Sequence, residues 1–139
     1  LSAALRSAGL DWPGPGHWIE CDTARIIWSG RDQAMLVGRE PDASWSAHAA
    51  LADVSDAACI LRLEGAGSED VLARLVPVDL RAPVFEDGRV MRTLCGHMSV
   101  SIARVAGGFE IMGFRSMAGT LVHELETAMA ALDARIRQG

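Results

Sequence analysis

A hairpin of two alternating strands near the C-terminus constrains the fold of this chain more than any other feature of its sequence. Over residues 97–105 an apolar side chain occupies every second position, so that Met98 and Val100 share one face of a strand. Ala106-Gly107-Gly108 is typical of a tight turn, and it leads into a second apolar run over residues 109–114. A period of two that reverses at a glycine turn predicts an antiparallel hairpin with one buried face.

The hairpin is followed by the strongest helical pattern in the chain. Apolar residues recur there at intervals of three and four, which predicts an amphipathic helix with one buried face. They are Ala118, Leu121, Leu125, Ala128, Leu132 and Ile136. Ser116 stands at the position of an N-cap. We therefore expect the helix to start at Ser116 and to pack on the sheet with Leu125 and Leu132 buried.

The same reasoning divides the rest of the chain into short elements separated by glycine, proline and aspartate. Helices are expected over residues 2–8, near residues 43–51 with Asp42 as N-cap, and after a cap at Ser68. Strands are expected at residues 17–22, 24–29, 33–37, 58–64 and 89–95. Together they predict a single α+β domain, residues 1–139, in which helices pack on a mostly antiparallel sheet.

Charge and composition exclude several classes of function. The net charge of −5 leaves no basic stripe that could bind a nucleic-acid backbone. All 13 basic residues are arginine, so the chain has neither a Schiff-base lysine nor a P-loop lysine. No apolar run approaches the ~20 residues of a membrane-spanning helix, and Leu1 to Gly9 is too short for a signal peptide. We therefore expect a cytoplasmic protein with no membrane contact.

Residues that commonly carry catalysis or bind metal ions are present, but their spacing suits neither role. The four histidines have no metal-ligand spacing, and no two of the three cysteines form a CxxC pair. We expect Cys21, Cys59 and Cys95 to be buried thiols. Cys95 and His97 are close in sequence, but Gly96 between them predicts a turn, and nothing orients the pair for nucleophilic attack. We predict no catalytic, cofactor-binding or metal-binding residue in this chain.

A chain without catalytic groups acts through its surface, and four residues are candidates for a partner-binding surface. Tryptophan and arginine are enriched at the energetic centres of interfaces. Trp12, beside Pro13 and Gly14, is expected in an exposed loop. The other candidates are Trp18, Trp28 and Arg115. Each kind of residue has an open alternative. The tryptophans could belong to the core and the sheet surface. Arg115 could form an internal salt bridge or a solvated helix end.

From about residue 53 to residue 130 the order of short motifs resembles a known family. The motifs are Asp53-Val54-Ser55-Asp56, Ile60-Leu61-Arg62-Leu63-Glu64-Gly65, Asp70-Val71-Leu72-Ala73-Arg74-Leu75, Val76-Pro77-Val78-Asp79-Leu80, Phe85, Gly88, Arg92-Thr93, Phe109-Glu110-Ile111 and Arg115-Ser116. Their order and spacing are similar to those of the gamma subunit of heterotetrameric sarcosine oxidase. The first fifty residues fit more loosely, through Ala24–Trp28 and Gln33–Val37. That family is similar in turn to the folate-binding module of glycine-cleavage aminomethyltransferases, which implies a fold like that module.

The resemblance implies one subunit of a four-chain complex. Enzymes of this family are oxidoreductases acting on a CH–NH bond: they demethylate sarcosine to glycine, pass the carbon to tetrahydrofolate and form hydrogen peroxide from oxygen. FAD, covalent FMN, NAD and the folate site belong to the two large subunits, and zinc belongs to the smallest. The resemblance therefore implies alpha, beta and delta subunits as partners, and a gamma subunit that holds no cofactor and has no activity alone.

The absence of one carboxylate agrees with a non-catalytic subunit. Aminomethyltransferases use an aspartate in the strand pair after the second helix to act on the folate nitrogens. No carboxylate occurs between Asp87 and Glu110 in this sequence, and the serine and methionine side chains of those strands cannot act as a general acid or base. A free-standing folate-binding or one-carbon-transfer module stays open as the alternative function. A small hydrolase that uses Cys95 or His97 is a third.

Overall fold

The computed structural model describes residues 1–22 and 24–138, which form two compact units. The N-terminal unit runs from Leu1 to Asp53 and includes Gly88–Val90. The C-terminal unit runs from Val54 to Asp87 and continues from Met91. The prediction of one domain over residues 1–139 stays a prediction.

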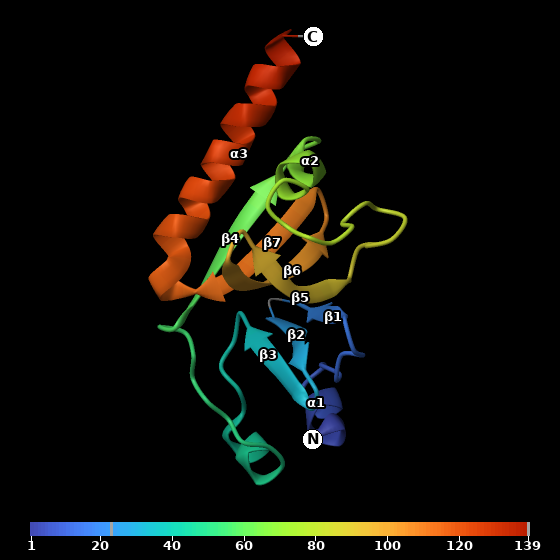
Figure 1. Cartoon of the computed structure of the whole chain (residues 1–139). Helices are drawn as coiled ribbons and strands as arrows, with labels where there is room; N and C mark the ends of the chain where they lie inside the picture. The colour runs from blue at the N-terminus through green and yellow to red at the C-terminus, as the bar shows by residue number, and fades with distance from the viewer. Residues whose placement is uncertain (23, 139) are drawn as a thin grey trace. The chain divides into compact units, whose positions relative to one another are not determined.

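The N-terminal unit consists of a short helix, a three-stranded antiparallel sheet and a 3₁₀ helix (Figure 1). These elements are α1 (Ser2–Ser7), β1 (Trp18–Cys21), β2 (Ala24–Gly30), β3 (Gln33–Val37) and η1 (Ala43–Ala47). The strand order is β1-β2-β3, so each strand pairs with its neighbour in the sequence, as local hairpins do. One face of the sheet buries a small core that includes Leu5, Ile26 and Trp45.

The η1 helix is shorter than the helix expected near residues 43–51. It starts after Asp42, as predicted, and the Asp42 carboxylate accepts hydrogen bonds from the Ser44 backbone N–H at 2.9 Å and the Ser44 hydroxyl at 2.7 Å. The element is a five-residue 3₁₀ helix, however, and ends at Ala47. Serine hydroxyls compete for backbone partners, and the Ser46 hydroxyl donates to the Ala43 carbonyl at 2.7 Å, which favours a short turn over a continued helix.

The C-terminal unit is a four-stranded sheet with two helices (Figure 1). Its elements are β4 (Ala58–Glu64), α2 (Ser68–Leu72), β5 (Val90–Cys95), β6 (Met98–Val105), β7 (Gly108–Phe114), η2 (Arg115–Met117) and α3 (Ala118–Gln138). The strand order is β4-β7-β6-β5, and β7 pairs antiparallel with both β4 and β6. The last strand of the chain is thus inserted between β4 and β6, which makes β4 an outer strand.

The predicted α+β class with antiparallel sheet structure is confirmed, and so is the C-terminal hairpin. Val105 pairs with Gly108, and Gly107 between them has φ +81°, the conformation that a tight turn requires of a glycine. The strands form two sheets, whereas the sequence predicts one. In the described chain β1, β2 and β3 pair only with one another, so they form a sheet separate from that of β4, β5, β6 and β7.

Two helix starts differ from the predicted ones. Gly67, and not Ser68, is the N-cap of α2, and Ser68 is the first helical residue with its side chain buried. Ser116 does not cap α3, because it lies inside η2, a 3₁₀ turn that runs directly into α3. The preceding turn sets the start of α2 through a backbone hydrogen bond from Ser68 N–H to Gly65 O at 3.1 Å.

The first half of α3 covers one face of the four-stranded sheet. Leu121, which is 0% exposed, packs in one core cluster with Phe109 and Ile111 of β7. Gly113 permits this close approach, because a Cβ at that position would lie 2.9 Å from Leu121 Cδ1. The buried face of α3 therefore depends on a residue without a side chain in the strand beneath it.

The two leucines predicted to be buried in α3 have different environments. Leu125 is 7% exposed, so its predicted burial is confirmed. Leu132 is only half-buried, and the prediction is wrong for it. The reason is that the second half of α3 runs beyond the sheet (Figure 1), and Leu132 packs beside Gly67 at the start of α2.

We expect Leu121→Ala to lower the free energy of unfolding by about 3 kcal/mol, because it removes a fully buried side chain above Gly113 and leaves a cavity. Met129→Ala is the matched control on the same helix: Met129 is 47% exposed, and its truncation should cost less than about 1 kcal/mol. Urea unfolding followed by far-UV circular dichroism measures both variants. Equal losses would show that the buried face of α3 is placed wrongly.

Candidate functional site

The three tryptophans predicted for a partner surface lie in the N-terminal unit, and all are half-buried. Trp12 lies in the loop between α1 and β1, as expected, but it packs against the core cluster that contains Leu5 and Trp45. The neighbouring Pro13 is fully buried. The expected exposed position of Trp12 is therefore wrong, because this loop lies against the core and does not project from it.

Trp18 and Trp28 lie on opposite faces of the sheet β1-β2-β3. Trp18 pairs with Ile27 in the register of β1 and β2, so these two side chains point the same way and Trp28 points the other way. The Arg25 guanidinium lies over the Trp18 ring, 5.7 Å from its centroid. The structure does not join the two tryptophans into one surface, and their role in partner binding stays a prediction.

Arg115, the fourth candidate, lies at the surface of the C-terminal unit. Its guanidinium is 3.9 Å from the Asp56 carboxylate, and 66% of its side chain is exposed. This contact is the internal salt bridge that the sequence left open as an alternative. An exposed ion pair at this distance contributes little to stability, so the guanidinium remains accessible to a partner.

Beside Arg115, two apolar side chains form an exposed patch. Phe114 is 62% exposed and Ile60 is 39% exposed. Phe114 pairs with Ala58 on β4, and Ile60 is two residues further along β4, so both side chains point to the same face of the sheet. Sequence reasoning missed Phe114 because an aromatic residue at the end of an apolar strand has the pattern of a core residue.

Cys95 and His97 do not form a catalytic pair. Cys95 is fully buried in the core, whereas His97 is exposed in the turn at Gly96, which has φ +59°. Burial raises the pKa of the Cys95 thiol, and the charge of Glu124 raises it further. The thiol is therefore protonated at neutral pH and is a poor nucleophile. All three cysteines are free, but only Cys95 has the expected burial, because Cys21 and Cys59 are half-buried.

Neither a metal-binding group nor a membrane-spanning helix is present in residues 1–22 and 24–138. Within those ranges no three histidine, cysteine, aspartate or glutamate side chains are grouped so that they could hold a metal ion. No helix there has both the length and the apolar character to cross a membrane.

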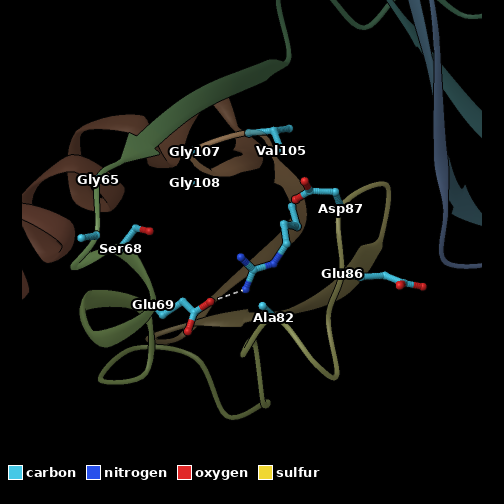
Figure 2. Close-up of a pocket in the computed structure, with 11 residues that line it drawn as sticks. Gly65, Ser68, Glu69, Ala82, Glu86, Asp87, Val105, Gly107 and Gly108 are labelled. Atoms are coloured by element: carbon cyan, nitrogen blue, oxygen red, sulfur yellow. Dashed lines mark hydrogen bonds and ion pairs between the residues drawn. The ribbon is translucent and has the colours of Figure 1, made fainter.

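An open cleft of about 820 Å³ lies in the C-terminal unit beside the start of α2 (Figure 2). The turn between β4 and α2, which starts at Gly65, forms part of its wall. The charged groups of the lining are three carboxylates, Glu69, Glu86 and Asp87, and the guanidinium of Arg104. An excess of carboxylates makes the cleft unfavourable for an anion.

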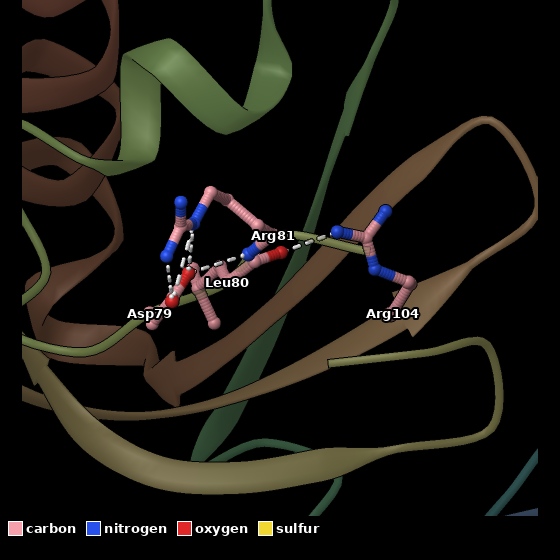
Figure 3. A network of polar contacts seen from close by, with 4 residues as sticks. All are labelled: Asp79, Leu80, Arg81 and Arg104. Carbon is pink, nitrogen blue, oxygen red and sulfur yellow. Dashed lines mark hydrogen bonds and ion pairs between the residues drawn. The ribbon is translucent and has the colours of Figure 1, made fainter. Parts of the chain in front are cut away.

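Arg104 is engaged inside the protein and is not free to bind a ligand in the cleft. Its Nη2 donates to Glu69 Oε1 at 2.6 Å and also to the carbonyl oxygen of Leu80 (Figures 2 and 3). The guanidinium lies 4.6 Å from the centroid of the Phe109 ring, and only 12% of the side chain is exposed. Arg104 therefore links β6 to three other parts of the unit, which are α2, the segment after α2, and β7.

The alternating pattern of β6 contains the signal for this buried arginine. Arg104 follows Met98, Val100 and Ile102 on the same face of the strand, which is the face that packs on the core. Sequence analysis missed the position because a charged residue at the end of an apolar row is usually solvated. The partners that make its burial possible, Glu69 and Leu80, are far away in the sequence.

A second arginine holds the segment that contains Leu80. The Asp79 carboxylate accepts hydrogen bonds from Arg81 Nη2 at 2.6 Å, from Arg81 Nε at 2.9 Å and from the Arg81 backbone N–H at 3.0 Å (Figure 3). These hydrogen bonds, the side-chain ones above all, lower the pKa of Asp79 from 3.8 to about 2. Asp79 is therefore ionised at neutral pH, and the turn around Leu80 is held from both sides.

We expect Arg104→Met to lower the free energy of unfolding by about 2–3 kcal/mol, because it leaves the Glu69 carboxylate and the Leu80 carbonyl without their donor. Arg31→Met is the control: the Arg31 side chain is 97% exposed, and its loss should change stability by less than about 0.5 kcal/mol. Urea unfolding monitored by tryptophan fluorescence measures both. If Arg104→Met lowers the free energy of unfolding no more than the control does, Arg104 has no structural role of this kind.

Comparison with known proteins finds a match among the solved structures. No protein-family model and no curated protein matches this sequence. Among solved structures, a chain of the heterotetrameric sarcosine oxidase from Corynebacterium sp. U-96, in complex with pyrrole 2-carboxylate, matches with a TM-score of 0.82 and 26% sequence identity. The match covers 94% of this chain and 73% of that chain. The chain is therefore similar in fold and sequence to a subunit of heterotetrameric sarcosine oxidase, and the resemblance recognised in its sequence is confirmed.

Proposed function

We propose that this chain is the non-catalytic gamma subunit of a cytoplasmic, heterotetrameric sarcosine oxidase. The observation that carries the proposal is the structural match to a chain of such an enzyme over 94% of this chain. The order of motifs from about residue 53 to residue 130 supports the gamma subunit in particular.

In the proposed complex the chemistry takes place in the alpha, beta and delta partners. The complex demethylates sarcosine to glycine, passes the carbon to tetrahydrofolate and forms hydrogen peroxide from oxygen. FAD, FMN, NAD, tetrahydrofolate and zinc are assigned to the partner subunits and none to this chain. The contribution of this chain is a surface that the partners contact.

The state of the reactive side chains supports a non-catalytic role. Cys95 is a buried thiol with a raised pKa, and Arg104 is engaged by Glu69 and Leu80. In contrast, Phe114 and Arg115 are exposed side by side, and they combine apolar area with a directed cation, as residues at interface centres do. Groups suited to contact are therefore available at the surface.

The cleft beside α2 is the observation that favours the alternative, a folate-binding module. Its lining argues against that function, because reduced folates carry carboxylates and would meet Glu69, Glu86 and Asp87. Titration of the isolated chain with tetrahydrofolate, followed by calorimetry, separates the two functions. Saturable binding would favour the folate-binding module.

Co-expression of this chain with the three other chains of its complex tests the proposal directly. We expect the four chains to purify together at equal stoichiometry through a tag on this chain, and the preparation to oxidise sarcosine and absorb as a flavoprotein. The chain expressed alone should be colourless and inactive. Flavin bound to the isolated chain, or failure of the wild-type chain to join the other three, would contradict the proposal.

The same preparation tests the predicted interface residues. We expect Arg115→Ala to increase the dissociation rate of this chain from the complex about tenfold, because it removes a charged contact beside the exposed Phe114 ring. Trp12→Ala tests the N-terminal unit in the same way, with thermal unfolding as a check on its half-buried position. Arg31→Ala, at a 97% exposed side chain, is the control. Unchanged dissociation for both variants would place the interface elsewhere.

A further inference from the structure

Two arginines stand apart from the other basic residues of the chain. Eleven of the 13 arginines have an ion pair, a side-chain hydrogen bond, a ring contact or another electrostatic interaction within residues 1–22 and 24–138. The side chains of Arg74 and Arg135 have none there. Arg74 follows α2 and Arg135 is in the second half of α3, so two elements bring them together.

Both arginines line the same groove. The groove has a volume of about 390 Å³ and lies between the end of α2 and the second half of α3. Its lining residues are Asp70, Ala73, Arg74, Leu132, Arg135 and Ile136. Ile136 is 70% exposed, the largest exposure among the large apolar side chains of the described chain. The groove thus combines two large apolar side chains, Leu132 and Ile136, with two guanidinium groups.

The charge of this groove is opposite to the charge of the chain as a whole. The chain has a net charge of −5, but the groove holds two guanidinium groups and one carboxylate, Asp70. The acids that adjoin lining residues in the sequence are already paired, because Glu69 contacts Arg104 at 2.6 Å and Asp133 contacts Arg137 at 2.5 Å. A partner that covers the groove must therefore supply carboxylates, since a guanidinium removed from water without a counter-ion is costly.

We propose that this groove is the docking site for an acidic segment of a partner subunit, in which an apolar side chain lies between carboxylates. The apolar side chain packs against Leu132 and Ile136, and the carboxylates accept hydrogen bonds from Arg74 and Arg135. The fork of donors on arginine suits a carboxylate partner. The proposal rests on the proposed function, because that function supplies the partner subunits.

One exposed segment of this chain is a poor occupant of the groove in a second copy. It combines acids with an apolar side chain, runs from Asp53 to Asp56 and includes Val54, which is 43% exposed. Asp56 already contacts Arg115 at 3.9 Å, and Asp53 has an interaction of its own. Insertion of this segment into the groove of another copy would therefore break existing contacts.

The experiment uses the four-chain complex with the charge-reversed variant Arg74→Glu/Arg135→Glu. We expect the variant chain to dissociate from the complex at least about tenfold faster than the wild type, because two attractive contacts become repulsive. We expect Ile136→Ser to weaken retention in the same direction. Arg31→Glu and Val84→Ser are matched controls, since Arg31 and Val84 are 97% and 60% exposed and neither lines the groove. The controls should dissociate at the wild-type rate.

The outcomes separate this inference from the proposed function. If the wild-type chain joins the complex and the charge-reversed variant is retained as well as the controls, the groove is not the docking site, while the proposed function stands. If the wild-type chain does not join the complex, the proposed function fails and this inference fails with it. Sedimentation of the isolated chain gives the third outcome: a dimer that only the groove variants disrupt would make a second copy the occupant and overturn the inference.

Discussion

A single buried guanidinium joins the parts of the C-terminal unit that the backbone leaves apart. Arg104 projects from β6, contacts Glu69 of α2 and Leu80 of the following segment, and lies against the Phe109 ring of β7. Sheet hydrogen bonds hold β4, β7, β6 and β5 together, but they do not position α2 or the segment after it. An arginine can do this because its donors are directed and always charged. The same two residues, Glu69 and Arg104, also line the cleft beside α2. Their contact occupies the one guanidinium group of that cleft.

The distribution of charged residues agrees with a role in assembly. Most arginines of the chain are used within the fold, where they fix turns and strands, as Arg81 fixes Asp79 and Arg62 contacts Glu110 at 3.7 Å. The exposed groups that stay available, Arg115 beside Phe114 and the pair that lines the groove, are next to apolar side chains. Apolar area next to an accessible cation is the composition of an interface centre more than of a solvated surface.

Local patterns predicted the elements of this fold, and non-local contacts account for what was missed. The period of two in β6 and the spacing of Leu121 and Leu125 depend on neighbours in the sequence, so the hairpin and the buried face of the first half of α3 were predicted correctly. The insertion of β7 between β4 and β6 and the burial of Arg104 depend on residues far apart in the chain. The exposed Phe114 follows from the same limit: its residue type indicates burial, and its 62% exposure at the end of β7, opposite Ala58, is set by the fold.

The division of α3 at Ala128 has a consequence for how such a chain can change. The first half of the helix is fixed by the core, where Gly113 leaves room for Leu121 and little else. The second half, from Met129 onward, is mostly exposed and packs on the core through Leu132. Substitutions there change the groove without altering what keeps the chain folded. In the proposed complex, selection on partner choice and selection on foldability thus act on different turns of one helix, so a lineage can exchange its partner without first redesigning its core.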